Sequence, residues 1–247
     1  MSAEVKNMIN SVFKKDIVIT PSLCDFSGHL SFANTFSVFQ DLAAESADAL
    51  GVGFKGLGER GLFWITAKTI IKFHRRPFMS DAVTLTSWPE HPQGLKCFRD
   101  YTMTCGDELL ITGKTLWAIM NMKTGQLHKV EEAYPEGIDL IDDIALEEDY
   151  SKIRPGFTGE ELGKYTVRST DIDVGQHMNN AAYVHAFAGM FSAEEWKQMN
   201  YQIAEVHFKN QCYEGETLTF SKSIEDGSLH AEATREDGKT AVQIILR

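Results

Sequence analysis

The sequence lacks the marks of an exported or membrane-spanning protein. No apolar run approaches the roughly 18 residues of a membrane helix, and the N-terminal residues contain no hydrophobic signal region. The four cysteines are scattered, without the CxxC spacing of a zinc or redox site; they are Cys24, Cys97, Cys105 and Cys212. We therefore expect free thiols in the cytoplasm, no membrane partner, and neither a metal nor another cofactor.

Basic residues are absent from one acidic stretch. The net charge is −11, but residues 131–150 hold nine Asp and Glu and no Lys or Arg, so the rest of the chain carries −2. The acidity therefore says little about what the folded parts bind, and it argues against nucleic acid as a partner.

The first half of the chain has the pattern of one helix followed by several strands. Ser31 is placed to cap a helix that runs to about Leu50. Alternating residues then predict strands at 63–76, 82–88, 95–105 and 109–121, and residues 122–163 have the pattern of a linker with at most marginal helix.

A glycine-rich connector follows the predicted helix and contains G-x-G-x-x-G at Gly51, Gly53 and Gly56. A dinucleotide site needs a strand before this motif and a helix after it. Here the order is reversed, so we exclude a cofactor loop and interpret the segment as a connector.

The second half repeats this order, with a strand near 164–171, a helix from Asn179 to about Phe191 and four further strands. The residues D-F-S-G-H-L-S-F-A-N at 25–34 align without a gap with D-V-G-Q-H-M-N-N-A-A at 173–182, and 71–78 align with 206–213. The offsets are 148 and 135. Two copies of one strand–helix–four-strand unit predict an α+β fold.

The stretch S-T-D-I-D-V-G-Q-H-M-N-N at 169–180 carries the strongest chemical signal. We interpret Thr170 to Val174 as the end of a strand, and the following turn brings Asp173 and His177 to a helix start. Helix-start amides lack intrahelical partners, so a carboxylate and an imidazole beside them could hydrolyse a carbonyl compound. A capped helix start without chemistry is the alternative.

Four stretches together resemble one family. They are the D-F-S-G-H segment with its helix, I-K-F-H-R-R-P-F-M-S-D, T-L-W-A-I-M-N-M-K-T-G and S-T-D-I-D-V-G-Q-H-M-N-N-A-A-Y. In order and spacing they are similar to acyl-acyl carrier protein thioesterases of the bacterial and plant type. That resemblance implies two tandem hotdog units, each a long helix wrapped by a curled antiparallel sheet. The expected boundaries are 1–121 for the first unit, 122–163 for the linker and 164–247 for the second unit.

The resemblance implies hydrolysis of acyl-acyl carrier protein in the second unit, with release of free fatty acid. Asp173 and His177 match the family motif D-x-N-x-H-x-N-N, and Gly175 stands where the family commonly has Asn. The family's Glu-Cys pair corresponds to Gln211 and Cys212. The amides near Asn179 and Asn180 are the expected oxyanion site.

The first unit is expected to hold the acyl chain and to receive the carrier. Phe36, Phe39 and Trp64 are the candidate chain-binding residues, and Asp25 and His29 imitate the motif. Strand alternation places a basic face along 68–76, with the carrier-docking candidates Lys68, Lys72, Arg75 and Arg76. The phosphopantetheine-linked acyl carrier protein is the expected partner, and a homodimer is possible because single hotdog units generally pair. An acyl-CoA thioesterase and a non-catalytic thioester-binding protein remain alternatives, the latter favoured by Gly175 and Gln211.

Overall fold

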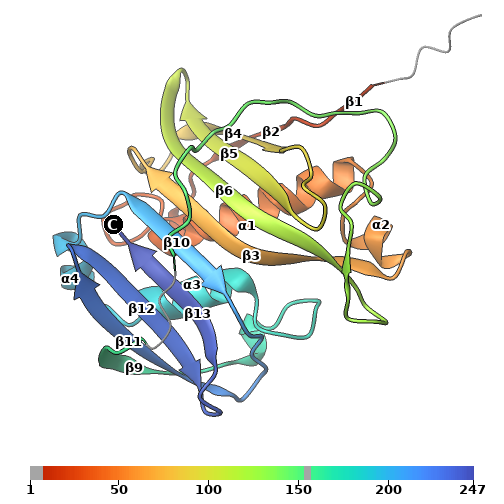
Figure 1. Cartoon of the computed structure of the whole chain (residues 1–247). Helices are drawn as coiled ribbons and strands as arrows, with labels where there is room; N and C mark the ends of the chain where they lie inside the picture. Colours follow the sequence, from red (N-terminus) through yellow and green to blue (C-terminus); the bar gives the residue numbers. More distant parts are fainter. Residues whose placement is uncertain (1–7, 153–156) are drawn as a thin grey trace, which may run out of the picture.

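One long, curled sheet forms the frame of the protein. The computed structural model describes residues 8–152 and 157–247, so residues 153–156 of the expected linker lie outside the described part. Eleven strands form this sheet, ten of them in the order β2-β4-β5-β6-β3-β10-β13-β12-β11-β9 (Figure 1). The first-unit strands are β2 (Phe13–Val18), β3 (Leu62–Phe73), β4 (Ala82–Pro89), β5 (Cys97–Cys105), β6 (Glu108–Asn121) and the short β7 (Leu127–His128). The second-unit strands are β9 (Glu160–Thr166), β10 (Ile203–Phe208), β11 (Thr217–Glu225), β12 (Ser228–Arg235) and β13 (Thr240–Leu246).

Each half of the sheet has its own long helix, and local capping chemistry starts each one. In α1 (Phe32–Ala49) the Ser31 side chain accepts from the Asn34 amide, as predicted. α3 (Asn180–Ala188) is half as long and ends before the predicted Phe191. A capping box of Ser192 and Glu195 starts α4 (Ala193–Gln198). The glycine-rich connector, for which no helix was predicted, contains the short helix α2 (Phe54–Gly58).

The two units face each other across an internal two-fold relation. β3 and β10 pair antiparallel with Ile70 opposite Glu205, and these two residues correspond at the offset of 135. Between the helices, Ser37 Oγ lies 3.2 Å from His185 Nε2, and these residues correspond at the offset of 148. Equivalent residues meet only where a two-fold axis passes. The expected α+β fold of two hotdog units is confirmed.

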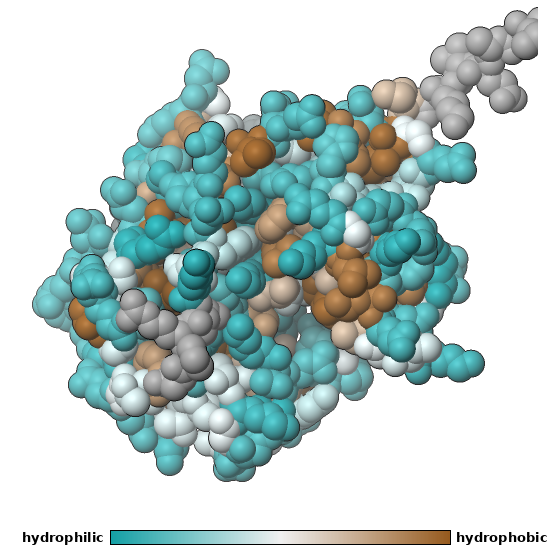
Figure 2. All heavy atoms as spheres, viewed as in Figure 1, coloured by the Kyte–Doolittle hydropathy of each residue, from teal (hydrophilic) through white to brown (hydrophobic). Residues whose placement is uncertain are grey.

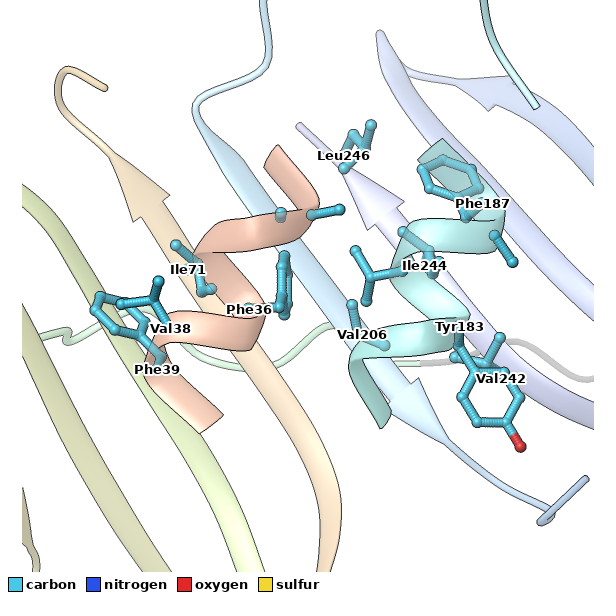
Figure 3. Packing of buried hydrophobic residues seen from close by; sticks show 14 of the residues in the cluster. Phe36, Val38, Phe39, Ile71, Tyr183, Phe187, Val206, Val242, Ile244 and Leu246 are labelled. Carbon is cyan, nitrogen blue, oxygen red and sulfur yellow. The ribbon is translucent and has the colours of Figure 1, made fainter. Parts of the chain in front are cut away.

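The main hydrophobic core lies between the sheet and the two long helices. Figure 3 shows Phe36 and Phe39 of α1 and Tyr183 and Phe187 of α3 on one face of the sheet, with Ile71 among the residues that they cover. A smaller cluster lies around α2. Within the described ranges, no helix is both long and apolar enough to cross a membrane.

The segment between the units crosses the opposite face of the sheet (Figure 1). It contains no helix within its described residues, and its only strands before β9 are β7 and β8 (Ile138–Asp139), the latter paired with β1 (Ile9–Asn10). Its backbone carbonyls accept from the sheet, as in Trp88 Nε1 to Asp143 O (2.8 Å) and Lys114 Nζ to Leu146 O (2.8 Å). Seen from this side, hydrophilic residues cover most of the surface and hydrophobic residues form separate patches (Figure 2).

A carboxyl group is buried beneath this segment. Asp100 of β5 is 0% exposed, and its Oδ1 accepts from the Ala145 amide at 3.2 Å. Burial raises its pKa to about 8, and the charge of Glu90 adds to the rise. Docking of the linker therefore holds a protonated carboxyl group in the core at neutral pH.

Candidate active site

The loop before α3 is a tight turn rather than a strand end. The strand predicted over 170–174 is wrong: η2 (Ser169–Asp171) is a single 3₁₀ turn, and β9 has already ended at Thr166. The turn closes with Asp173 N to His177 O at 3.0 Å and Gln176 N to Asp173 O at 3.0 Å. These bonds bring Asp173 and His177 to the same side of the loop.

Asp173 and His177 are close but do not hydrogen bond. Asp173 Oδ1 lies 3.9 Å from His177 Nδ1, which instead lies 3.2 Å from the Met178 carbonyl. Asp173 Oδ1 accepts from the Gly175 amide at 2.8 Å. Within the described residues Oδ2 accepts no hydrogen bond, and the side chain is 27% exposed. That oxygen is therefore available to a water molecule or a substrate.

Gly175 lies against the side chains of both Asp173 and His177. A Cβ at this position would lie 2.8 Å from His177 Nε2 and 3.0 Å from Asp173 Oδ1. The imidazole thus lies in space that a residue with a side chain would use. Because Gly175 has no side chain, it provides no bridge between Asp173 and His177.

The start of α3 offers one amide. Asn179 is the N-cap: its side chain accepts from Ala181 N at 2.8 Å, and its own amide donates to Asp171 O at 2.8 Å. The Asn179 amide therefore cannot bind an oxyanion, and the expected pair is reduced to one. Among the described residues the Asn180 amide has no acceptor, which leaves its N–H for a developing negative charge.

The strand-end pair has split roles. Gln211 is exposed, and its Oε1 lies 3.4 Å from Tyr213 Oη. Cys212 is 0% exposed, and burial raises the pKa of its thiol, against a smaller lowering by Tyr183. Its carbonyl accepts from Met178 N at 2.8 Å. This bond anchors the loop of residues 169–179, which we call the active loop. Cys212 thus acts here through its backbone, as a positioning residue.

A small cavity lies where α3 begins. Its volume is about 20 Å³, room for a single water molecule. Of the predicted chain-binding residues it includes Phe36 and Phe39 but not Trp64, whose Nε1 donates to Val52 O in the smaller cluster. The remaining lining residues are Gln40, Thr66, Thr69, Tyr101, Thr115, Trp117, Asn180, Ala181 and Phe208. Sequence reasoning missed Tyr101 and Trp117, although strand alternation from the buried Cys97 and Met103 places Tyr101 on the same face.

The four predicted docking cations do not form an open basic face. Lys72 pairs with Glu148 of the linker, and Lys68 Nζ lies 5.2 Å from the centre of the Tyr150 ring. Arg75 binds Glu108 through two hydrogen bonds of 2.8 and 2.7 Å. Arg76 pairs with Asp25. Lys72, Arg75 and Arg76 are thus paired with carboxylates of the linker, of β6 and of the loop before α1, and the docking role of the four cations stays a prediction.

The site has the parts for carbonyl chemistry. It combines a free carboxylate oxygen, a nearby imidazole and a helix-start amide, beside a cavity lined by aromatic side chains. In the described part of the chain, no group of three His, Cys, Asp or Glu side chains is close enough to hold a metal ion.

Comparison with known families identifies both halves of the chain. The family model for the acyl-ACP thioesterase N-terminal domain matches residues 10–138, and that for the C-terminal domain matches residues 158–246. The first match continues into the expected linker as far as residue 138, and the second begins at residue 158, before the expected start of the second unit at 164.

Relatives and solved structures give the same picture. A chloroplastic acyl-[acyl-carrier-protein] hydrolase of Cuphea viscosissima is 25% identical over 230 residues, which are 88% of this chain and 54% of that protein. A chloroplastic dodecanoyl-[acyl-carrier-protein] hydrolase of Cinnamomum camphora is 25% identical over 76% of this chain and 52% of its own length. The chain thus spans about half the length of these curated relatives.

An acyl-ACP thioesterase from Bacteroides thetaiotaomicron has the same fold, with a TM-score of 0.86 at 19% identity over 96% of this chain and 97% of that one. The 12:0-ACP thioesterase from Umbellularia californica has a TM-score of 0.81 at 19% identity, over 96% of each chain.

Proposed function

This chain belongs to the acyl-ACP thioesterase family, and from that premise we propose that it hydrolyses the thioester of acyl-acyl carrier protein and releases free fatty acid. One observation carries the proposal. The unbonded Oδ2 of Asp173 lies in the loop that leads to the free Asn180 amide, and that end of α3 meets an aromatic-lined cavity of the first unit.

The proposed reaction needs one water molecule and no other co-reactant. Asp173 Oδ2 accepts a proton from the water as its oxygen attacks the thioester carbon. The Asn180 amide donates to the oxyanion of the tetrahedral intermediate. The carbon–sulfur bond then breaks, and the proton held by Asp173 passes to the departing pantetheine sulfur. His177 acts beside the carboxylate as a positioning residue.

The small cavity sets a condition on this chemistry. A volume of about 20 Å³ cannot hold an acyl chain, so Phe36, Phe39 or Trp117 must move when substrate enters. The walls are formed by residues of α1, α3, β3, β5, β6 and β10.

The test is a turnover assay with two carriers. The purified chain is incubated with acyl-acyl carrier protein and with acyl-CoA of the same chain, and both free fatty acid and free thiol are measured. We expect equal amounts of both products from the carrier protein and loss of both with Asp173→Asn. Hydrolysis of acyl-CoA alone would indicate an acyl-CoA thioesterase. Binding without release would indicate a non-catalytic thioester-binding protein, the alternative that the missing bridge at Gly175 favours.

The partner and the compartment belong to the same proposal. We infer that acyl carrier protein is the macromolecular partner and that its docking surface includes positions other than the paired cations Lys72 and Arg76. The free thiols of Cys24, Cys97, Cys105 and Cys212 support a reducing, cytoplasmic compartment. A homodimer of this chain stays a prediction.

A further inference from the structure

The first unit contains a loop equivalent to the active loop, and it is the more completely bonded of the two. Asp25 N donates to His29 O at 2.9 Å and Leu30 N to Pro77 O at 2.9 Å; in the second unit Asp173 N donates to His177 O and Met178 N to Cys212 O. By this match Ser27 stands at the position of Gly175, and Arg76 at the position of Gln211.

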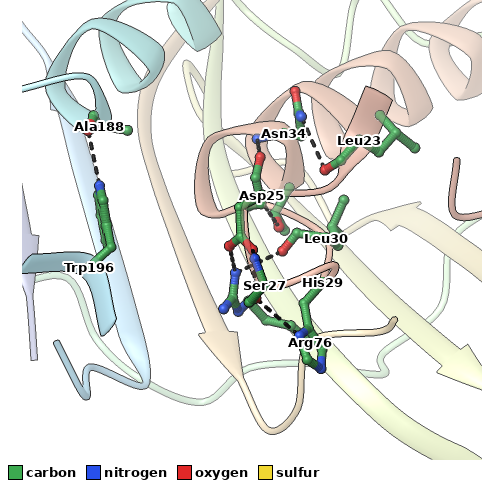
Figure 4. Close-up of polar contacts among 11 residues, drawn as sticks. Leu23, Asp25, Ser27, His29, Leu30, Asn34, Arg76, Ala188 and Trp196 are labelled. Carbon is green, nitrogen blue, oxygen red and sulfur yellow. Dashed lines mark hydrogen bonds and ion pairs between the residues drawn. The ribbon is translucent and has the colours of Figure 1, made fainter. Parts of the chain in front are cut away.

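Three side chains of this first loop and Arg76, which follows β3, form one network (Figure 4). Ser27 Oγ donates to Asp25 Oδ1 at 2.6 Å and lies 3.1 Å from His29 Nδ1. Arg76 Nη1 donates to Asp25 Oδ2 and, at 3.1 Å, to the carbonyl of Leu30. In the second loop the corresponding carboxylate and imidazole are 3.9 Å apart with nothing between them.

A cavity lies beside this network, with Asp25 and Arg76 among its lining residues. It has a volume of about 310 Å³, against about 20 Å³ at the second loop, and that volume is typical of small-molecule pockets. The two cavities are two-fold counterparts. Phe32, Ala33, Phe73 and Ala188 line the large one, and their equivalents Asn180, Ala181, Phe208 and Gln40 line the small one.

A difference in helix length explains the difference in volume. α3 ends at Ala188, whereas its counterpart α1 continues past Gln40 to Ala49. The short helix α4 follows, and its Trp196 donates to the Ala188 carbonyl at 3.0 Å and forms one wall of the cavity (Figure 4). Most of the walls are apolar. Ser31, Tyr201 and His185, whose pKa burial lowers, are polar lining residues, and Asp25 and Arg76 form the ion pair of the lining.

We propose that this cavity is a second site for an acyl thioester, separate from the hydrolytic loop. The apolar walls of Phe32, Phe73 and Trp196 suit a linear acyl chain, and the polar end meets its carbonyl. Asp25 and Arg76 form an ion pair, so the polar end has no net charge, which favours a neutral thioester or amide over a free carboxylate. The class of ligand rests on the proposed function.

The site binds its ligand without hydrolysing it. Burial raises the pKa of Asp25, but hydrogen bonds from Ser27 and Arg76 outweigh this, and the pKa lies below its ordinary value. Both carboxylate oxygens are engaged, Oδ1 with Ser27 and Oδ2 with Arg76. A carboxylate bound in this way is a poor base, in contrast to Asp173, whose Oδ2 is unbonded.

Calorimetric titration of the full chain with decanoyl-pantetheine amide, which cannot be hydrolysed, tests the proposal. Ala188→Leu fills the large cavity, and Gln40→Leu is the matched change at the two-fold counterpart. We expect two molecules bound per wild-type chain, and in Ala188→Leu one molecule, bound at the second loop. The fold of each variant is checked by circular dichroism.

Three outcomes would overturn the proposal. The first is one molecule bound per wild-type chain, with the same binding in Ala188→Leu. The second is two molecules still bound by a folded Ala188→Leu protein. The third is no binding of the amide to the wild-type chain. Binding that Ala188→Leu removes, in a chain that releases no fatty acid from any thioester, would support this site and refute the proposed hydrolysis.

A separate variant tests whether the Asp25–Arg76 ion pair selects a neutral head group. Wild type should bind decanoic acid at least about tenfold more weakly at this site than the amide. Asp25→Asn leaves Arg76 unpaired and should reverse this preference by strengthening the binding of the acid. An equal preference in both proteins would show that the ion pair does not select the head group and would overturn the assignment of a neutral ligand.

Discussion

Replacement of Gly175 by Ser should complete the interrupted network of the active loop. The two loops share their backbone hydrogen bonds, and at the equivalent position Ser27 Oγ lies 2.6 Å from Asp25 Oδ1 and 3.1 Å from His29 Nδ1. Gly175 has no left-handed φ, so a side chain is compatible with its backbone. A new Cβ would lie 2.8 Å from His177 Nε2, and the end of that side chain can move aside.

The expected gain follows from one hydrogen bond. A bridge that holds His177 in place contributes about 1 kcal/mol, which corresponds to roughly a fivefold increase in kcat/KM if it acts in the transition state. The assay is steady-state release of fatty acid from acyl-acyl carrier protein, with unfolding by denaturant as a check on stability.

Gly175→Ala is the matched control for this variant. It introduces the same Cβ and displaces the same imidazole but adds no hydroxyl group, so it should not raise kcat/KM. Equal increases in both variants would assign the effect to crowding of His177. A decrease in both would show that the imidazole already occupies its working position, and that the bridge in the first loop is no guide to the second.

Asp173→Asn and His177→Ala should each lower kcat by roughly 10²-fold. Asp226→Asn, in the exposed turn between β11 and β12, is the control and should leave kcat unchanged. A similar loss of kcat in that control would contradict the assignment. Cys212→Ala should keep most of the activity because the thiol is buried and its pKa is raised, and inactivity of a folded variant would assign the thiol to the chemistry. Asp100 should make the protein less stable as the pH rises from about 4 to about 8. The folded chain keeps a proton that the unfolded chain releases, a contribution of about 1.4 kcal/mol per pH unit. Asp100→Asn should remove that slope in urea unfolding across this range, and an unchanged slope would refute the buried acid.

The shared backbone conformation of the two loops could be predicted from the sequence repeat but not from the residue types. The second turn residue has φ +76° at Gly28 and φ +62° at Gln176, so the two loops have the same backbone although only one uses glycine. The repeat in the sequence therefore predicts the equivalence of the loops, and the residue type alone does not.

Structural features that depend on neighbouring residues in the chain could be predicted from the sequence. Ser31 and Ser192 cap helices through bonds to residues three positions away, and the alternation along β3 predicts that Ile71 and Phe73 share the face that packs in the main core. The repeat offsets of 148 and 135 predicted both units and the correspondence of Asp25 with Asp173. These features depend on neighbours in the chain, so a linear pattern records them.

Tertiary structure decided what the cations and the cavities do. Lys72 meets Glu148 and Arg76 meets Asp25 across 76 and 51 positions, so these two cations of the basic face expected from alternation are paired with carboxylates. The early end of α3 opens a cavity of about 310 Å³ at the first loop, while the longer α1 leaves about 20 Å³ at the second. Ion pairs and empty volumes depend on which distant segments pack together, and local periodicity carries no information about that packing.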